Sequence, residues 1–435
     1  MRVKGNEDVV HERFPASDRR GARRRIKRKV YQKMKTTKFK PSEVGPIPVD
    51  WEVKRLGEIG DVVTGSTPPR DDMECWGGNY NWISAKDFKD KYIVDSEEKV
   101  TSKGMAFCRL LPSDSVLVTC IASIGLNAIA KNPCATNQQI NAVICKACNN
   151  EYLYYQIEAA KDRMIELAGQ TAVPIINKGD FENLMIPLPP CAEQEKIAEA
   201  LSDVDALLAA TTKLIEKKRA IKQGAMQQLL TGKKRLAGFT GKWVEKRLGE
   251  CSTMFAGGTP SSNVDGCYGG AIPWASISDI SIAGKYIEAT SETLTEEGLN
   301  NSSAKWYPQN TLLFAMYASI GKCCIARKRM TSSQAILGIY NFRDVDIEFL
   351  YYLLTFRNGE LLTMGQTGTQ ANLSKSIVED VIIDAPTLAE QKAIASVLSD
   401  MDAEVAALEA KRAKYERIKQ GMMQELLTGK TRLED

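Results

Sequence analysis

The stretch KQGAMQQLLTGKKRL, from Lys222 to Leu236, returns as KQGMMQELLTGKTRL from Lys419 to Leu433. Twelve of the fifteen positions are identical, and the two copies lie 197 residues apart. Each copy has apolar residues at helical spacing and then reaches Thr-Gly-Lys, where glycine is the usual residue just after a helix end. The chain therefore contains the same helix ending twice.

A repeat covers nearly the whole sequence. WEVKRLGEIGDVVTGSTPP, from Trp51 to Pro69, matches WVEKRLGECSTMFAGGTPS, from Trp243 to Ser261. The offset between matching segments rises from 192 to 197 residues along the chain, which indicates small insertions in surface loops. Later matches are Ala-Ser-Ile-Gly at 122–125 and 318–321, Gly-Gln-Thr at 169–171 and 365–367, and Glu-Gln at 193–194 and 390–391.

Each copy divides into a mixed domain and a long helix. Short apolar runs such as SVLVTCI and NTLLFAM alternate with Gly-Pro and Gly-Gly turn signals, which favours an α+β fold. A stretch without proline or internal glycine then runs for more than thirty residues in each copy. The predicted parts are an α+β domain over 41–190, a helix over 191–232, an α+β domain over 241–387 and a helix over 388–430.

Apolar residues in both long helices recur at heptad spacing, as in Ile197, Leu201 and Val204. A long helix with a narrow apolar stripe needs a partner helix, so each helix is expected to pair with the other in a coiled coil. Thr387 and Glu390 have the spacing of a capping box at the start of the second helix. Gly224 and Gly421 weaken a helix, which suggests close backbone approach, subunit docking or simple tolerance near a frayed end.

Residues 1–40 form a basic leader with fifteen Lys or Arg against four Asp or Glu. The other 395 residues hold 43 basic and 50 acidic side chains, so any nucleic-acid affinity there must come from local patches. The leader is predicted to be disordered. Its alternatives are a DNA-binding arm or a start assigned upstream of a natural start at Met34.

The sequence lacks the motifs of a catalyst. Its one histidine, His11, lies in the leader, which excludes histidine general-base catalysis and a His-ligated metal in the rest of the chain. The Gly429-Lys-Thr segment is not a P-loop, because Gln424 stands where the first glycine belongs. Cys145 and Cys148 form one CxxC without a second pair, so no metal site is predicted. No apolar run reaches membrane-spanning length and no signal peptide is present, so the expected location is cytoplasmic.

Four features occur in duplicate and in the same order: Trp-(x)4-Leu-Gly, Gly-x-Thr-Pro, Ser-Ile-Gly, and Pro-x-x-x-Glu-Gln opening a long helix. With these features the chain, apart from its basic leader, resembles the specificity subunit of Type I restriction–modification enzymes. The resemblance implies two target-recognition domains separated by two long helices that pair as an antiparallel coiled coil, with internal pseudo-two-fold symmetry. Each domain would read one half of an asymmetric bipartite site in double-stranded DNA.

The resemblance also implies that catalysis belongs to partners. Two methyltransferase subunits would hold the helices and recognition domains, and restriction–motor subunits would join this core. S-adenosylmethionine, ATP and Mg²⁺ are expected in those partners, and no cofactor is expected in this chain. The alternatives are a single-chain restriction–methyltransferase and a coiled-coil scaffold without a role at DNA.

Base readout needs polar or basic side chains on loops. Positions that differ between the copies, such as Lys86 against Ser278, are favoured for specificity, whereas repeated ones such as Gly65 and Gly257 also suit turn formation. The predicted DNA-binding residues of the first domain are Ser66, Thr67, Ser84, Lys86, Lys89, Lys91, Asn137, Gln138, Gln139, Gln170 and Thr171. Those of the second domain are Gly258, Thr259, Ser276, Ser278, Ser333, Gln334, Gln366, Thr367, Thr369 and Gln370.

Partner contacts are expected where the two copies are most alike, since two copies of one partner need the same surface twice. These positions lie at the beginning and at the end of each long helix. The predicted partner-binding residues are Glu193, Gln194, Gln223, Gly224, Gln227, Glu390, Gln391, Gln420, Gly421 and Gln424.

Overall fold

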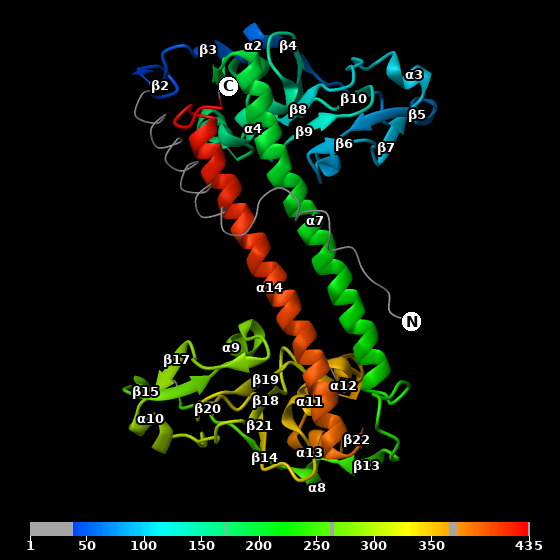
Figure 1. The fold of residues 1–435 in the computed structure, drawn as a ribbon, viewed down its shortest axis with the longest axis vertical. Coiled ribbons are helices and arrows are strands. Elements are labelled where there is room, and N and C mark those ends of the chain that lie inside the picture. Colours follow the sequence, from blue (N-terminus) through cyan, green and yellow to red (C-terminus); the bar gives the residue numbers. More distant parts are fainter. Residues whose placement is uncertain (1–37, 170–171, 262–264, 365–371, 434–435) are drawn as a thin grey trace, which may run out of the picture. The chain divides into compact units, whose positions relative to one another are not determined.

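The structure is a computed structural model that describes residues 38–169, 172–261, 265–364 and 372–433 (Figure 1). The chain divides into two compact units. In unit 1, the described residues up to Ala210 pack with those from Arg412 onward, and unit 2 runs from Thr211 to Lys411. Each unit therefore holds one α+β domain, half of one long helix and half of the other.

The domain of unit 1 contains a five-stranded sheet in the order β4-β11-β8-β9-β6 and a three-stranded sheet in the order β10-β5-β7. In the larger sheet only β6 and β9 pair in parallel. The strands are β1 (Phe39–Lys40), β2 (Ile47–Pro48), β3 (Glu52–Arg55), β4 (Gly60–Thr64), β5 (Trp76–Ile83), β6 (Tyr92–Ile93), β7 (Glu98–Val100), β8 (Val116–Thr119), β9 (Asn127–Ala130), β10 (Cys134–Thr136), β11 (Ile140–Cys145) and β12 (Met185–Leu188).

The domain of unit 2 repeats this topology, with orders β14-β21-β18-β19-β16 and β17-β15-β20. A further antiparallel pair joins an early strand of each domain to its last strand, β3 with β12 and β13 with β22. The strands are β13 (Val244–Arg247), β14 (Thr253–Ala256), β15 (Tyr268–Ala275), β16 (Tyr286–Ile287), β17 (Glu292–Leu294), β18 (Leu312–Ala315), β19 (Cys323–Ala326), β20 (Thr331–Ser332), β21 (Ile336–Tyr340) and β22 (Ile382–Ala385).

Helices cover one face of each five-stranded sheet, with α4 (Asn150–Ala159) on β9 and α11 (Ile347–Phe356) on β19 (Figure 1). The short helices of unit 1 are α2 (Leu56–Ile59), η1 (Met73–Cys75), η2 (Ala85–Asp87), α3 (Ser102–Met105), α5 (Lys161–Leu167) and α6 (Lys178–Glu182). Those of unit 2 are α8 (Leu248–Cys251), α9 (Ile277–Ile282), α10 (Glu296–Asn300), α12 (Asn358–Met364) and α13 (Lys375–Glu379).

The continuous apolar runs of the sequence become strands that are buried on both faces. In β8, Val116 and Val118 pack with Leu153 of α4, whereas Leu117 packs on the opposite face with Ile83. This division follows from the two-residue period of a strand. The four residues of β18 are likewise all buried, which places the centre of each domain at this middle strand.

The two long helices are α7 (Cys191–Leu229) and α14 (Leu388–Leu426), of 39 residues each. In unit 1, Ile197 and Leu201 of α7 share a core with Leu426 of α14. In unit 2, the corresponding core joins Leu229 of α7 to Leu398 of α14. Within each unit, the start of one long helix therefore packs against the end of the other. None of the helices in the described ranges is long and apolar enough to cross a membrane.

The repeated ending joins the end of one long helix to the start of the other in each unit. Gly232 and Gly429 have φ of 67° and 69°, a left-handed backbone that favours glycine after a helix. A Cβ on Gly232 would lie 3.3 Å from the ring of Trp243, so this turn packs directly on that indole. Three residues later the chain reaches Arg235, whose guanidinium binds the carboxylate of Glu390.

The same joint in unit 1 has an additional acidic partner. Arg432 donates to both carboxylate oxygens of Glu193 at 2.8 Å and to Asp50 at 2.6 and 2.9 Å. Trp51 Nε1 donates to Glu193 at 3.1 Å. The hydrogen bond from Arg432 holds the pKa of Asp50 below its ordinary value, although burial opposes this. Each unit is therefore fastened by an arginine that follows one long helix and a glutamate in the first turn of the other.

Replacing the arginine of this joint should destabilise unit 1 strongly. In Arg432→Met the Glu193 carboxylate, which is 4% exposed, keeps its burial and loses its cation, so we expect a loss of about 3 kcal/mol in unfolding free energy. The control Arg219→Met removes an exposed pair with Glu409 and should cost less than about 1 kcal/mol. Urea unfolding of the full-length variants measures both. Equal losses would show that the joint is no stronger than a surface ion pair.

Candidate nucleic-acid interface

In unit 1 the turn after β4 and the loop after β10 form one surface. The N–H groups of Gly65 and Ser66 donate to Ile140 O at 3.1 Å and Thr136 O at 2.8 Å. A Cβ on Gly65 would lie 2.2 Å from Asn137 O, so only glycine fits this approach. The repeated glycine is thus a structural residue that brings residues 65–67 against 136–139.

Two side chains on this surface were predicted independently and meet. Thr67 Oγ1 donates to Gln138 Oε1 at 2.5 Å. A further hydrogen bond fixes the turn at residues 65–67, since Trp82 Nε1 donates to Ser66 O at 3.0 Å. The adjacent N–H of Asn137 donates to Ile83 O at 3.1 Å, which brings the third predicted loop, beginning at Ser84, beside the other two.

Unit 2 repeats this construction with different surface residues. Gly258 N–H donates to Ser332 O at 2.9 Å, and Trp274 Nε1 donates to Gly258 O at 2.9 Å. Ser333 N–H donates to Ala275 O at 3.0 Å, so the same three loops meet. A Cβ on Gly257 would lie 2.3 Å from Ser332 O. The backbone frame of the two loop sets is shared, and Gln138 and Gln334 are equivalent, whereas other exposed side chains differ, as Lys86 does from Ser278.

The predicted DNA-binding residues differ in exposure. Gly258 and Ser333 are buried, so both residues shape the loops from inside, and their contact with DNA stays a prediction. Six of the predicted residues, Gln170, Thr171, Gln366, Thr367, Thr369 and Gln370, lie outside the described residues. The exposed ones are Lys86, Lys89, Gln138, Thr259, Ser278 and Gln334. Those of intermediate exposure are Ser66, Thr67, Ser84, Lys91, Asn137, Gln139 and Ser276.

Lys91 points into the domain. Its side chain is 11% exposed and its ammonium forms an ion pair with Glu151 of α4. It also donates to Tyr155 Oη at 3.0 Å and to Ser202 Oγ of α7 at 2.8 Å. This placement argues against the predicted contact with DNA.

Basic and aromatic side chains beside the loops were missed by sequence reasoning. Arg70 stacks 4.0 Å from the ring of Trp76 and binds Glu98, whose pKa it lowers. Arg109 donates to Thr64 O at 2.5 Å, and the neighbouring Phe107 ring is half-exposed. These residues lie outside the repeated segments. Basic–aromatic pairs also occur in unit 2, where Lys305 lies over the Phe255 ring and Arg329 over the Trp306 ring.

The repeated Glu-Gln pairs are interior residues. Glu193, Gln194, Glu390 and Gln391 are 4%, 2%, 1% and 0% exposed. Gln194 Oε1 accepts from Asn149 N–H at 2.9 Å, and its Nε2 donates to Pro189 O at 2.8 Å. Gln391 makes the same pair of bonds in unit 2, with Asp346 N–H and Pro386 O. Their polar atoms are therefore used inside each unit, and contact with a partner stays a prediction for these four residues.

The other predicted partner-binding residues do face solvent. Gln223, Gln227, Gln420, Gly421 and Gln424 are exposed, and Gly224 is partly exposed. A Cβ on either glycine would meet nothing within 4 Å, so the predicted close approach of helices at these residues is not found in the described chain. Space for a docking subunit remains the explanation that these glycines still fit.

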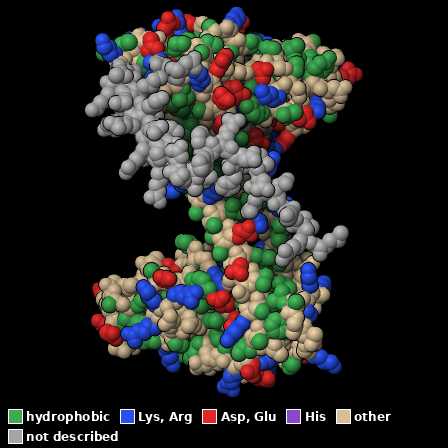
Figure 2. Space-filling view, viewed as in Figure 1, with side chains coloured by type: hydrophobic (Ala, Val, Ile, Leu, Met, Phe, Trp, Pro, Cys, Tyr) green, Lys and Arg blue, Asp and Glu red, His purple; other side chains and the backbone are tan. Residues whose placement is uncertain are grey.

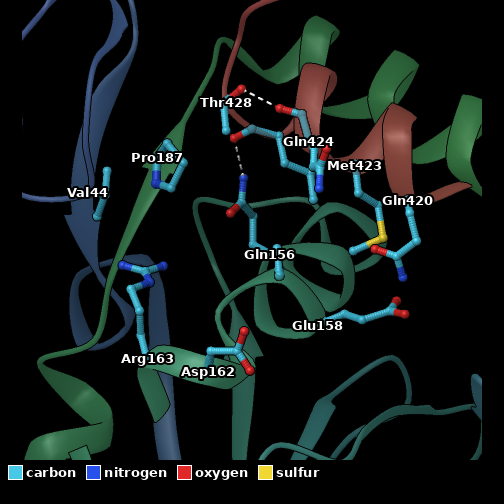
Figure 3. A pocket seen from close by; sticks show the side chains of 12 residues that line it. Val44, Gln156, Glu158, Asp162, Arg163, Pro187, Gln420, Met423, Gln424 and Thr428 are labelled. Atoms are coloured by element: carbon cyan, nitrogen blue, oxygen red, sulfur yellow. Dashed lines mark hydrogen bonds between the residues drawn. The ribbon is translucent and has the colours of Figure 1, made fainter. Parts of the chain in front are cut away.

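A cavity of about 410 Å³ opens beside this surface in unit 1 (Figure 3). Gln420, Gln424 and Thr428 of the α14 end line one side, and Gln156 and Glu158 of α4 line the other (Figure 3). Gln156 Nε2 donates to Leu427 O at 3.2 Å across it. The cavity wall thus combines repeated residues of the helix end with residues specific to the first domain.

No group of three or more Cys, Asp, Glu or His in the described residues could hold a metal ion. Burial raises the pKa of Cys145 to about 12 and that of Cys148 further, which opposes thiolate formation. On the face in Figure 2, acidic and basic side chains are interspersed over the described surface.

These features define a class of protein: a duplicated recognition scaffold, in which the internal joints are the same and the loop surfaces differ. The family model described as Type I restriction modification DNA specificity domain matches residues 48–220 and 240–420. The chain therefore belongs to this family, and the resemblance to specificity subunits is confirmed.

The matches to known proteins cover different lengths of this chain. The MjaVIII specificity subunit of Methanocaldococcus jannaschii is 26% identical over 442 residues, covering 93% of this chain and 99% of that protein. The MjaIX specificity subunit of the same organism is 38% identical over 180 residues, but the match spans only 42% of its length. The S subunit from M. genitalium has a TM-score of 0.57 at 15% identity, covering 90% of this chain and 98% of that one, which supports the fold.

An alanine at the exposed helix glycine should separate stability from docking. Gly421→Ala is expected to stabilise the free chain by about 1 kcal/mol, because the new Cβ meets no atom and alanine favours a helix. If a partner approaches the backbone there, the same change weakens its binding. Urea unfolding and titration with the candidate methyltransferase subunit measure the two effects. Gly359→Ala, at an open position on α12, is the control and should leave partner binding unchanged. If partner binding is also unchanged in Gly421→Ala, close docking at Gly421 is excluded.

Proposed function

We propose that this chain is the non-catalytic, sequence-specific DNA-recognition subunit of a Type I restriction–modification complex. The observation that carries the proposal is the duplicated loop set: the same backbone hydrogen bonds hold Gly65–Thr67 and Gly257–Thr259, while some exposed side chains around them differ, as Lys86 does from Ser278. Two scaffolds with the same frame and different reading residues suit two different DNA half-sites. The relatives, by their names, are specificity subunits of Type I restriction enzymes.

The target is proposed to be an asymmetric bipartite site in double-stranded DNA. Exposed Lys86, Lys89 and Gln138 are the favoured reading residues of the first domain, and Thr259, Ser278 and Gln334 are those of the second. Gln138 and Gln334 are equivalent, so the difference lies in the lysines, which make directional contacts to guanine edges in the major groove, whereas serine and threonine accept several bases. The two half-sites should therefore differ in sequence.

The long helices are proposed to pair as an antiparallel coiled coil that sets the spacing between the half-sites. Each helix of 39 residues is about 58 Å long at 1.5 Å per residue. Half-sites one turn of DNA apart are about 34 Å from centre to centre, which such a helix pair can span. An approximate two-fold relation between the units would present the domains to the duplex in opposite orientations.

Methyltransferase subunits are proposed to dock on the exposed helix ends, and restriction–motor subunits to join that complex. The chemistry of S-adenosylmethionine, ATP and Mg²⁺ would lie in those partners. Support comes from the outward-facing Gln223, Gln227, Gln420 and Gln424, which are repeated although nothing in their own units requires them.

The direct test is a footprint of the full chain with its candidate methyltransferase on random-sequence DNA. A protected site with two defined halves and an unread spacer supports the proposal. Protection of a single continuous site, or binding without sequence preference, would contradict it. Sequencing of methylated adenines in cells with and without this chain gives an independent measurement of the same target.

Lengthening both helices should change the spacer alone. The boundary between the units crosses α7 after Ala210 and α14 after Lys411, so inserting four residues (about one turn) at both points preserves the contacts inside each unit. We expect the preferred spacer to shift while both half-site sequences stay the same. The single insertion after Ala210 is the control, since it leaves the helices unequal. A changed half-site sequence in the double insertion would contradict the spacing role.

A further inference from the structure

One loop in each domain varies between two fixed ends. The first variable loop, residues 84–91, begins at Ser84, and the second, residues 276–285, begins at Ser276. At the start of each loop an aspartate closes the turn: Asp87 Oδ2 accepts from Ser84 N–H, and Asp279 Oδ2 accepts from Ser276 N–H, both at 2.8 Å. The second loop is two residues longer and contains α9, where the first contains η2.

The other end of each loop is a lysine that leads into the sequence Lys-Tyr-Ile. Lys91 and Lys285 are 11% and 10% exposed. Their carbonyl groups accept from Ile129 N–H and Ile325 N–H, both at 2.8 Å, where β6 and β16 begin. The variable loops thus return to the same place in the sheet despite their different lengths.

The two ammonium groups have equivalent partners. A lysine ammonium has three donors, and Lys285 uses them on Glu348 at 2.9 Å, Tyr352 Oη at 3.3 Å and Ser399 Oγ at 2.6 Å. Lys91 has the same set in Glu151, Tyr155 and Ser202. With all three donors engaged and little exposure, neither lysine has a proton left for a DNA phosphate.

The contacts continue into both long helices. Tyr155 Oη donates to Asp205 of α7 at 2.6 Å, and Asp205 pairs with Lys419 of α14 at 3.0 Å. Burial, then the hydrogen bond to Asp205, raises the pKa of Tyr155, which keeps the phenol protonated as the donor. Tyr352, Asp402 and Lys222 repeat the series in unit 2.

We propose that Lys91 and Lys285 are positioning residues for half-site recognition, each holding the end of a variable loop on the long helix. The inference rests on the proposed function and goes beyond it, because it assigns to the two buried lysines the placement of the reading residues between the fixed ends. These include the exposed Lys86 and Lys89 in the first loop and Ile282, which is 86% exposed, in the second. A buried lysine costs desolvation that an apolar residue would avoid, and its directional bonds fix one orientation of the loop.

The test uses the full chain with its methyltransferase partner and four variants. Lys91→Met removes the ammonium, and Lys91→Met with Glu151→Gln also removes the carboxylate left unpaired, in case the single variant folds poorly. Lys131→Met is the control, since Lys131 pairs with Asp114 near the same strand edge and is 39% exposed. Lys285→Met is the matching variant of the second domain.

Three quantities are measured: affinity for DNA changed in either half-site, the salt dependence of binding, and amide exchange of residues 84–91 without DNA. We expect Lys91→Met to lose roughly tenfold in discrimination at the first half-site only, with faster exchange and an unchanged salt slope. Lys285→Met should do the same for the second half-site, and Lys131→Met for neither.

Two results would overturn the inference. A salt slope smaller by about one, with unchanged amide exchange, would show that Lys91 contacts a phosphate directly. Unchanged discrimination with faster exchange would show that the lysine only stabilises the loop. The wild-type complex distinguishes these two results from failure of the proposed function. A chain without a bipartite preference would show no half-site discrimination that a variant could lose, although its amide exchange would still report on the loop.

Discussion

The buried glutamate in the first turn of each long helix is the constraint on which the rest of each unit depends. Glu193 and Glu390 are almost without exposure, and a carboxylate so placed must keep a cation. Arg432 and Arg235 supply it from the opposite helix ending. This requirement fixes where each ending lies, packs its glycine on a tryptophan and leaves the adjacent domain a firm base for its loops.

That constraint explains most of the near-identity of the two fifteen-residue endings. Lys222 and Lys419 point inward to aspartates, and Leu229 and Leu426 enter the cores. These residues repeat because two equivalent joints have to be closed. The outward glutamines and glycines have no such internal reason, so the part of the repeat that invites a partner is smaller than the sequence alone indicates.

The sequence predicted two tandem domains of mixed helix and sheet and a long helix after each, because periodicity and glycine are local signals, whereas the helices end at Leu229 and Leu426, before the predicted bounds of 232 and 430. It could not show that the side chains of Glu193 and Lys91 face inward. Repetition shows that a residue is needed in both copies, but whether its side chain faces inward depends on a partner distant in sequence, and Arg432 lies 239 residues from Glu193. The same limit applied to Glu390, interpreted as part of a capping box, whose carboxylate is bound by Arg235. Arg70 and Phe107 were missed because they lie between the repeated segments.

The surroundings of the two helix endings differ although the endings themselves are nearly identical. In unit 2 the position of Gln156 is occupied by Leu353 and that of Glu158 by Thr355, so the polar wall of the cavity belongs to unit 1. Among the described residues, Trp243 Nε1 is also buried without a hydrogen-bond partner, whereas Trp51 Nε1 donates to Glu193. A subunit that touched only the outward glutamines and glycines would meet the same surface twice, and one that reached past them would distinguish the two units.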